Sequence, residues 1–140
     1  MTVVVCLSDG EGMLFNKRRQ SRDRALIKDV ADMCGEKKAL CISGFSEKYL
    51  KESGIAVCVF DNPLKAAGDG DVVFVENLPL APYLYKIKRL VIYRWNRTYP
   101  TDFKIDINPE KSGMTLVSTL DFQGYSHEKI TKEIWNKKGV

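Results

Sequence analysis

The sequence predicts an α/β fold with a mostly parallel central sheet, flanked by helices and completed by a C-terminal antiparallel hairpin. Up to about residue 95, apolar β-branched runs alternate with segments of helical periodicity, which is typical of a parallel sheet. The remainder loses that alternation and ends in extended segments. At 140 residues, the chain has a length that suits one domain, 1–140, with its own core.

The first strand and the first helix are separated by a polar loop. Residues 2–7 form a continuous apolar run, as in a strand buried on both faces, and a turn-rich loop follows at residues 8–12. A helix is predicted for residues 21–34, with Ser21 as its cap and Asp23 in its first turn. Ligands of open α/β sheets bind beyond the carboxyl ends of the strands, so this loop is a candidate binding region.

The other elements follow in order along the chain. Strands are predicted at residues 39–42, 55–60, 72–75, 90–93 and 113–122, and helices at residues 46–52, 63–67 and 79–85. Ser46 is the expected cap of the second helix. Residues 128–136 are ambiguous, because the spacing of Ile130 and Ile134 fits a helix while the β-branched composition suits a strand.

Composition and charge exclude several classes of protein. Hydrophobic residues make up 44% and charged residues 29% of the chain, as in ordinary globular proteins. No apolar run approaches the roughly 20 residues of a membrane span, and the N-terminus lacks the features of a signal peptide. The net charge of +4 is weak for a dedicated nucleic-acid binder. The four cysteines form no CxxC pair, so we expect reduced thiols, a cytoplasmic location and no metal site.

One stretch carries much of the candidate chemistry. Five cationic side chains and one acid lie within residues 17–24, at the start of the predicted helix. Helix N-termini attract anions, and Arg can bind phosphate or carboxylate in bidentate fashion. The candidate ligands of a small anion are Lys17, Arg18, Arg19 and Arg22. The alternative is a solvated face whose cations pair with Asp23, Asp29 and Asp32.

Three further candidates each have a structural alternative. Asp23 could act as a general acid, but Arg22 and Arg24 should keep it ionised, which favours an ion-pair role. His127 can titrate near neutral pH, yet no nucleophile sits beside it in a known arrangement, which favours a hydrogen-bonded structural role.

Residues 93–100 mix arginines with aromatic side chains, a composition that can stack on a base and hold its phosphate. The residues proposed for this contact are Tyr93, Arg94 and Arg97. The alternative is a strand on which core aromatics alternate with surface cations.

The order and spacing of these elements resemble dihydrofolate reductase over nearly the whole chain. The matching features are the apolar first strand, the acid near the start of the first helix, the strand–helix–strand of residues 72–93, Asp102 and Ser126-His127. The resemblance implies the dihydrofolate reductase-like fold and favours a strand at residues 128–136. It also implies that Asp23 stands where the family has the acid that protonates the bound pterin.

The sequence departs from that family at the cofactor site. Where the family has a Gly-Gly pair that lets the backbone approach the phosphates of NADPH, this chain has Glu76 and Asn77, whose side chains and charge oppose a pyrophosphate. NADPH is therefore possible but not predicted as a cofactor. If Glu76 faces the cleft, it would meet Arg18 or Arg19 and give a salt-bridged cleft without catalysis.

A closer resemblance is carried by the runs MLFNKRRQSRD, FVENLPLAPY, YRWNRTYPTDF and FQGYSHEKITKE. They are similar to those of a small family of uncharacterised bacterial proteins of about this length, some of them labelled ribonuclease Z. That label implies a two-zinc site with several histidines, whereas this chain has one histidine, His127, and no HxHxDH run.

Three functions follow as expectations. The preferred one is a dihydrofolate reductase-like protein that binds a small anionic ligand, a nucleotide or organic phosphate, in an Arg-rich cleft without the usual NADPH phosphate site. The second is an NADPH-dependent reductase of altered specificity, which Asp23 and Ser46 motivate. The third is an RNA- or protein-binding module, for which the net charge is a weak motive. The sequence leaves the oligomeric state open.

Overall fold

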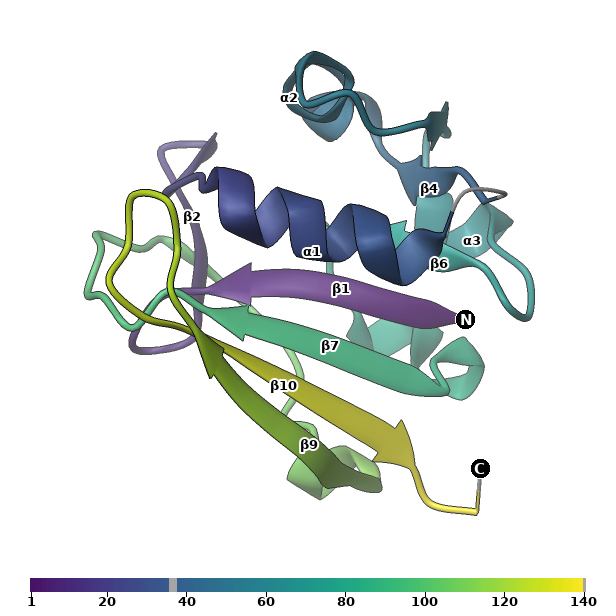
Figure 1. The fold of residues 1–140 in the computed structure, drawn as a ribbon. Helices are drawn as coiled ribbons and strands as arrows, with labels where there is room; N and C mark the ends of the chain where they lie inside the picture. Colours follow the sequence, from purple (N-terminus) through teal and green to yellow (C-terminus); the bar gives the residue numbers. More distant parts are fainter. Residues whose placement is uncertain (36–37, 140) are drawn as a thin grey trace.

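The computed structural model describes residues 1–35 and 38–139, and a seven-stranded sheet forms its centre (Figure 1). The strand order is β5-β4-β6-β1-β7-β10-β9. The five parallel strands are β1 (Thr2–Leu7), β4 (Leu40–Ile42), β5 (Val57–Val59), β6 (Val72–Phe74) and β7 (Arg89–Arg94). An antiparallel hairpin, β9 (Met114–Phe122) and β10 (Ile130–Lys137), is added to β7. The predicted fold class and the strand at residues 128–136 are confirmed.

Helices cover both faces of this sheet. They are α1 (Arg24–Cys34), α2 (Gly44–Glu52), α3 (Pro63–Ala66) and the 3-10 helices η1 (Ala81–Lys86) and η2 (Glu110–Ser112). Helix α1 lies across β1 and β7 (Figure 1), where Leu26 and Val30 pack with Val4 and Val91 of the sheet. The opposite face buries Val3 and its neighbours against α3 and η1. Within residues 1–35 and 38–139, no helix has the length and apolar character needed to cross a membrane.

A second, smaller sheet joins a hairpin that precedes α1 to a short strand near residue 103, and the sequence analysis treated the hairpin region as loop and helix start. Its order is β3-β2-β8, with β2 (Gly12–Phe15), β3 (Arg18–Arg19) and β8 (Phe103–Lys104). Asn16 and Lys17 have positive φ angles of 51° and 60°, as in the two-residue turns that suit a twisted hairpin. The turn places Arg18 and Arg19 on an extended strand rather than on a helix N-terminus.

Two predicted helix caps are wrong. Helix α1 begins at Arg24, and its N-cap is Asp23, whose Oδ1 accepts a hydrogen bond from the backbone N–H of Ala25 at 2.8 Å. Ser21 lies before the helix. Helix α2 begins at Gly44 with Ser43 at its N-cap, so Ser46 lies inside the helix and is fully buried. Ser and Asp are both good capping residues, and tertiary contacts decide which of them takes the position.

Candidate functional site

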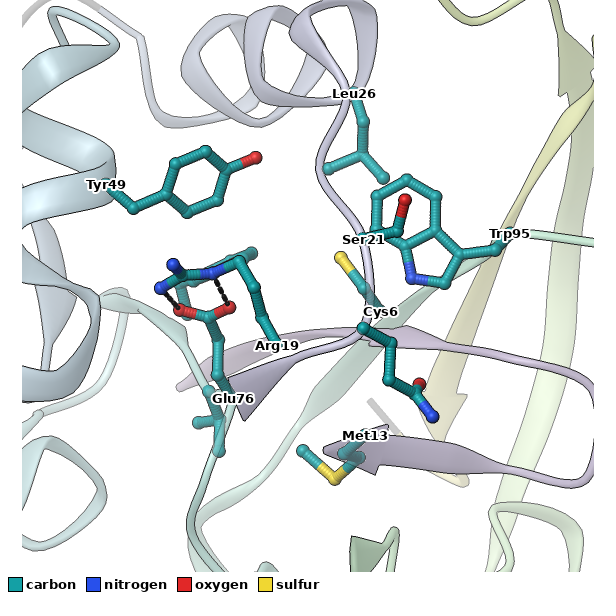
Figure 2. Close-up of a pocket in the computed structure, with 11 residues that line it drawn as sticks. Cys6, Met13, Arg19, Ser21, Leu26, Tyr49, Glu76 and Trp95 are labelled. Atoms are coloured by element: carbon teal, nitrogen blue, oxygen red, sulfur yellow. Dashed lines mark hydrogen bonds and ion pairs between the residues drawn. The ribbon is translucent and has the colours of Figure 1, made fainter. Parts of the chain in front are cut away.

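A small cavity lies beyond the carboxyl ends of β1, β6 and β7, where the β2–β3 hairpin meets α1 and α2 (Figure 2). The lining side chains come from all of these elements: Cys6, Met13, Arg19, Gln20, Ser21, Leu26, Tyr49, Phe74, Val75, Glu76 and Trp95. Its volume of about 20 Å³ leaves room for about one water molecule. The expected ligand edge of the sheet is therefore occupied by the protein's own side chains.

Arg19 and Glu76 form an ion pair that lines this cavity. Arg19 donates from Nε to Oε2 and from Nη2 to Oε1 of Glu76, both at 2.8 Å, and the Oγ of Ser46 donates to the same Oε1 at 2.6 Å. The guanidinium also lies over the rings of Tyr49 and Phe45, at 4.3 and 5.3 Å from their centroids. Glu76 thus meets Arg19, one of the two arginines expected for it, in a bidentate pair beside the ring of Tyr49 (Figure 2).

Burial controls the protonation of the other groups at this cavity. Burial raises the pKa of the Cys6 thiol, and the nearby Glu76 charge raises it further. Burial also raises the pKa of the Tyr49 hydroxyl. For Arg19, burial lowers the pKa, but the hydrogen bond and the charge of Glu76 more than offset it. At neutral pH Arg19 is therefore charged, while Cys6 is a protonated, unreactive thiol.

Asp23 is the centre of a second, more deeply buried network. Oδ1 accepts from the backbone N–H groups of Ala25 and Tyr125, and Oδ2 accepts from the N–H and Oγ of Ser126. The Nδ1 of His127 lies 2.9 Å from Oδ2. Burial alone would raise the pKa of Asp23, but the hydrogen bonds from Tyr125, His127, Ser126 and Ala25 hold it well below its ordinary value.

This geometry opposes the general-acid role for Asp23. The carboxylate stays ionised, as predicted, but for a different reason: the hydrogen bonds outweigh its burial, while the neighbouring arginines contact other groups. Arg22 lies over the ring of Tyr49 at 5.3 Å and Arg24 over that of Tyr125 at 4.8 Å. A carboxylate that accepts five hydrogen bonds is a poor proton donor at neutral pH.

His127 joins Asp23 to a hydroxyl that the sequence analysis missed. Its Nε2 lies 3.0 Å from Ser21 Oγ and 3.2 Å from the hydroxyl of Tyr99. The ring is buried and stacks on Trp95, with centroids 4.7 Å apart. The sequence analysis expected a hydrogen-bonded role for His127 and named no hydroxyl beside it, and the structure places the Ser21 hydroxyl there. Ser21 is 106 residues away in the sequence, so no spacing rule could have found the contact.

Most cations of the predicted cluster have no acid partner among the residues that the structure describes. Within residues 1–35 and 38–139, no ion pair is made by Lys17, Arg18, Arg22, Arg24 or Arg97. Asp23 binds His127, and Asp29 binds Lys132 at 2.8 Å. The alternative of a face neutralised by its own aspartates is therefore wrong for these two acids.

Hollows border these cations in several places. One, of about 490 Å³, runs beside the β2–β3 hairpin and is lined by Phe15, Asn16, Arg18, Arg19, Gln20, Tyr99 and Pro100. A smaller one, of about 180 Å³, is lined by Arg22, Asp23, Arg24, Ile27, Tyr49, Ser53, Tyr125 and Ser126. Arg24 also lines a hollow of about 530 Å³ beside α1. In the first two of these hollows, cations of segment 17–24 thus lie beside aromatic rings that other parts of the chain supply.

The candidates on β7 do not join this site. Tyr93 is fully buried and donates its hydroxyl to Asp29, and Arg94 is paired with Glu11 and Glu133 at 2.8 and 2.7 Å. Arg97 lies exposed beyond the end of β7. The base-stacking interpretation therefore fails for Tyr93, which is a core aromatic.

Asn77 is another of the predicted ligand-binding residues. Asn77 accepts a weak hydrogen bond from Ser43 Oγ at 3.3 Å. In the part of the chain that the structure describes, no group of three or more His, Cys, Asp or Glu side chains could hold a metal ion.

A solved structure shares this arrangement of elements. A dihydrofolate reductase from Enterococcus faecalis, in complex with NADP(H) and RAB-propyl, superimposes with a TM-score of 0.66 over 98% of this chain and 95% of that chain. The chain has a dihydrofolate reductase-like fold. Sequence identity is 9%, so the likeness extends to the fold alone, and function must be argued from the site. The sequence matches no protein-family model and no curated protein.

Proposed function

We propose that this dihydrofolate reductase-like scaffold binds a small anionic molecule, a nucleotide or an organic phosphate, in the groove beside the β2–β3 hairpin. The observation that carries the proposal is the exposed Arg18, which lines a groove of about 490 Å³ and has no ion pair within the described residues. An arginine fork matches phosphate geometry and offers two parallel hydrogen bonds. The hairpin turn holds Arg18 on an extended strand, which preorganises it for an anion.

The aromatic residues of the groove support a nucleotide over a simple phosphate. Phe15 is 40% exposed although it is large and apolar, and the ring of Tyr99 lines the same groove. Exposed aromatic rings beside an arginine can stack on a base while the cation holds its phosphate. The groove thus offers both halves of a nucleotide-binding surface.

The position of Glu76 supports a ligand at this groove rather than NADPH at the end of β6. Its carboxylate takes three hydrogen bonds from Arg19 and Ser46. A pyrophosphate approaching the end of β6 would meet this fixed negative charge, and Arg19 would be available to it only after the pair had broken.

Isothermal calorimetry with adenosine 5′-monophosphate, inorganic pyrophosphate and NADPH, at low and moderate salt, tests the proposal. We expect saturable binding of the monophosphate that weakens as salt rises and that Arg18→Ala reduces about tenfold, since a charge-assisted hydrogen bond contributes about 1.5 kcal/mol or more. Arg89→Ala is the matched control, because Arg89 is exposed at the opposite end of β7.

The other outcomes decide between the alternatives. An absence of binding at millimolar concentration, or an equal loss in Arg18→Ala and Arg89→Ala, contradicts the proposal. NADPH binding that Arg18→Ala leaves unchanged would instead favour the reductase function.

A further inference from the structure

We propose that Ser21, His127 and Asp23 form a nucleophile–base–carboxylate triad that transfers the acyl group of a small ester to water. Ser21 Oγ lies 3.0 Å from Nε2 of His127, and Nδ1 of the same ring lies 2.9 Å from Oδ2 of Asp23. The three side chains thus form a continuous hydrogen-bonded chain with the spacing that serine nucleophiles require. This activity is independent of the anion groove.

The tautomer of His127 follows from its partners. An ionised carboxylate only accepts hydrogen bonds, so Nδ1 carries the hydrogen that faces Asp23. Nε2 then has the free electron pair and accepts the hydroxyl hydrogen of Ser21. Trp95, stacked at 4.7 Å, holds the ring plane in place. This is the orientation that a general base needs.

The contacts among Asp23, His127 and Ser21 include groups that the capping of α1 does not use. Capping of α1 uses one oxygen of Asp23, which accepts from Ala25 N–H. The second oxygen is directed at His127, and the far nitrogen of that ring meets Ser21, which takes no part in the cap. Ser21 is also half-buried and lines the cavity of Figure 2, on the side of Trp95 and opposite Tyr49.

The cavity that Ser21 lines has room for the water molecule that the reaction consumes. Its volume of about 20 Å³ accommodates about one water molecule. The Oε1 atom of Gln20 is buried there without a hydrogen-bond partner within the described residues, so it is an acceptor suited to orient that water.

The proposed reaction has two balanced steps. Ser21 Oγ bonds to the ester carbonyl carbon while Nε2 of His127 takes the hydroxyl proton; the tetrahedral intermediate then collapses, and the alcohol leaves with that proton. Water next attacks the acyl-serine as His127 takes its proton. The carboxylic acid is released, and the proton returns to Ser21 Oγ.

A fluorophosphonate probe, read by peptide mass spectrometry on the full-length folded protein, tests the triad. We expect a single adduct on Ser21 and slow hydrolysis of p-nitrophenyl acetate with an initial burst. Ser21→Ala should abolish both, and His127→Gln should slow labelling more than 100-fold. Ser118→Ala is the control, because Ser118 is exposed on β9, away from this site.

A second test needs no His127 variant. Labelling of Ser21 should be lost when the wild-type protein is unfolded in urea before the probe is added, because His127 lies more than 100 residues from Ser21 and Asp23 in the sequence and meets them only in the folded chain. No adduct on the folded wild-type protein, an adduct on another residue, or hydrolysis that persists in Ser21→Ala would each overturn the proposal.

Discussion

The two charged networks beside the cavity stabilise a buried carboxylate in different ways. Glu76 is neutralised by a full opposite charge, with side-chain exposures of 19% for Arg19 and 10% for Glu76. Asp23 is fully buried beside an almost equally buried His127, at 4%, and it is stabilised chiefly by hydrogen-bond donors. The first network joins β3 to the end of β6, and the second joins α1 to the β9–β10 turn.

The difference shows where each network is vulnerable. In the Arg19–Glu76 pair, removal of either partner leaves a partly buried charge without compensation. In the Asp23 network five donors share one acceptor group, so the loss of one donor is tolerated better than the loss of the carboxylate. Asp23 should therefore affect stability more than Glu76 does.

Asp23→Ala should cause the largest loss. The substitution removes the N-cap of α1 and leaves the N–H groups of Tyr125 and Ser126 and the imidazole of His127 without their acceptor. We expect the free energy of unfolding to fall by about 3–5 kcal/mol, since several hydrogen bonds to a charged group are lost together. Urea denaturation followed by circular dichroism measures it.

The control for that prediction is Asp32→Ala, an exposed carboxylate on the same helix. It should change the free energy of unfolding by less than about 0.5 kcal/mol. Similar losses in the two variants would contradict the central role of Asp23.

Acid should weaken the same network reversibly. The pKa of Asp23 in the folded protein lies below its ordinary value of 3.8, so the unfolded chain binds its proton first as the pH falls. The stabilisation is complete above that ordinary value and is lost below it, as the pH approaches the folded-state pKa. Unfolding free energies measured from pH 6 to pH 2 should therefore fall more steeply for the wild type than for Asp23→Asn.

Gly124→Ala should disturb the Asp23 network by steric contact. An added Cβ would lie 2.6 Å from Oδ2 of Asp23 and 2.9 Å from the carbonyl oxygen of His127. We expect a loss of about 2 kcal/mol, within the range for overpacking a tight site. Gly44→Ala is the control, because nothing lies within 4 Å of its added Cβ; an equal loss there would show that the contact with Asp23 is irrelevant.

The sequence was sufficient for the main sheet because burial patterns are local. Residues 2–7 and 90–93 are apolar on both faces, and these runs became the central strands β1 and β7. The β2–β3 hairpin was missed for the opposite reason. Arg18 and Arg19 have no strand signature, and the turn uses Asn16 and Lys17 rather than the usual Asn-Gly.

The site was predictable where charge alone decides a contact. Opposite charges near one cleft predicted that Glu76 would meet an arginine, and it meets Arg19. The contact of Ser21 with His127 depends on how the β9–β10 turn packs against the start of α1, over a separation of 106 residues. No local pattern encodes such packing, so tertiary structure was needed to reveal it.

A double-mutant cycle on Arg19 and Glu76 should show the smallest effect of the series. Because the pair is bidentate and mostly buried, we expect a coupling free energy of about 1–2 kcal/mol from Arg19→Ala, Glu76→Ala and the double variant. The exposed Lys51–Glu47 pair of α2, with side-chain exposures of 58% and 39%, should give about 0.3–0.5 kcal/mol.

The ratio of the two couplings measures how far water reaches the cavity. A coupling for Arg19–Glu76 that is no larger than that of Lys51–Glu47 would mean that solvent screens the pair. Glu76 would then be easily displaced, and Arg19 would become available to an incoming phosphate. A larger coupling means that the pair closes the cavity, which leaves the exposed Arg18 as the arginine that an anion meets first.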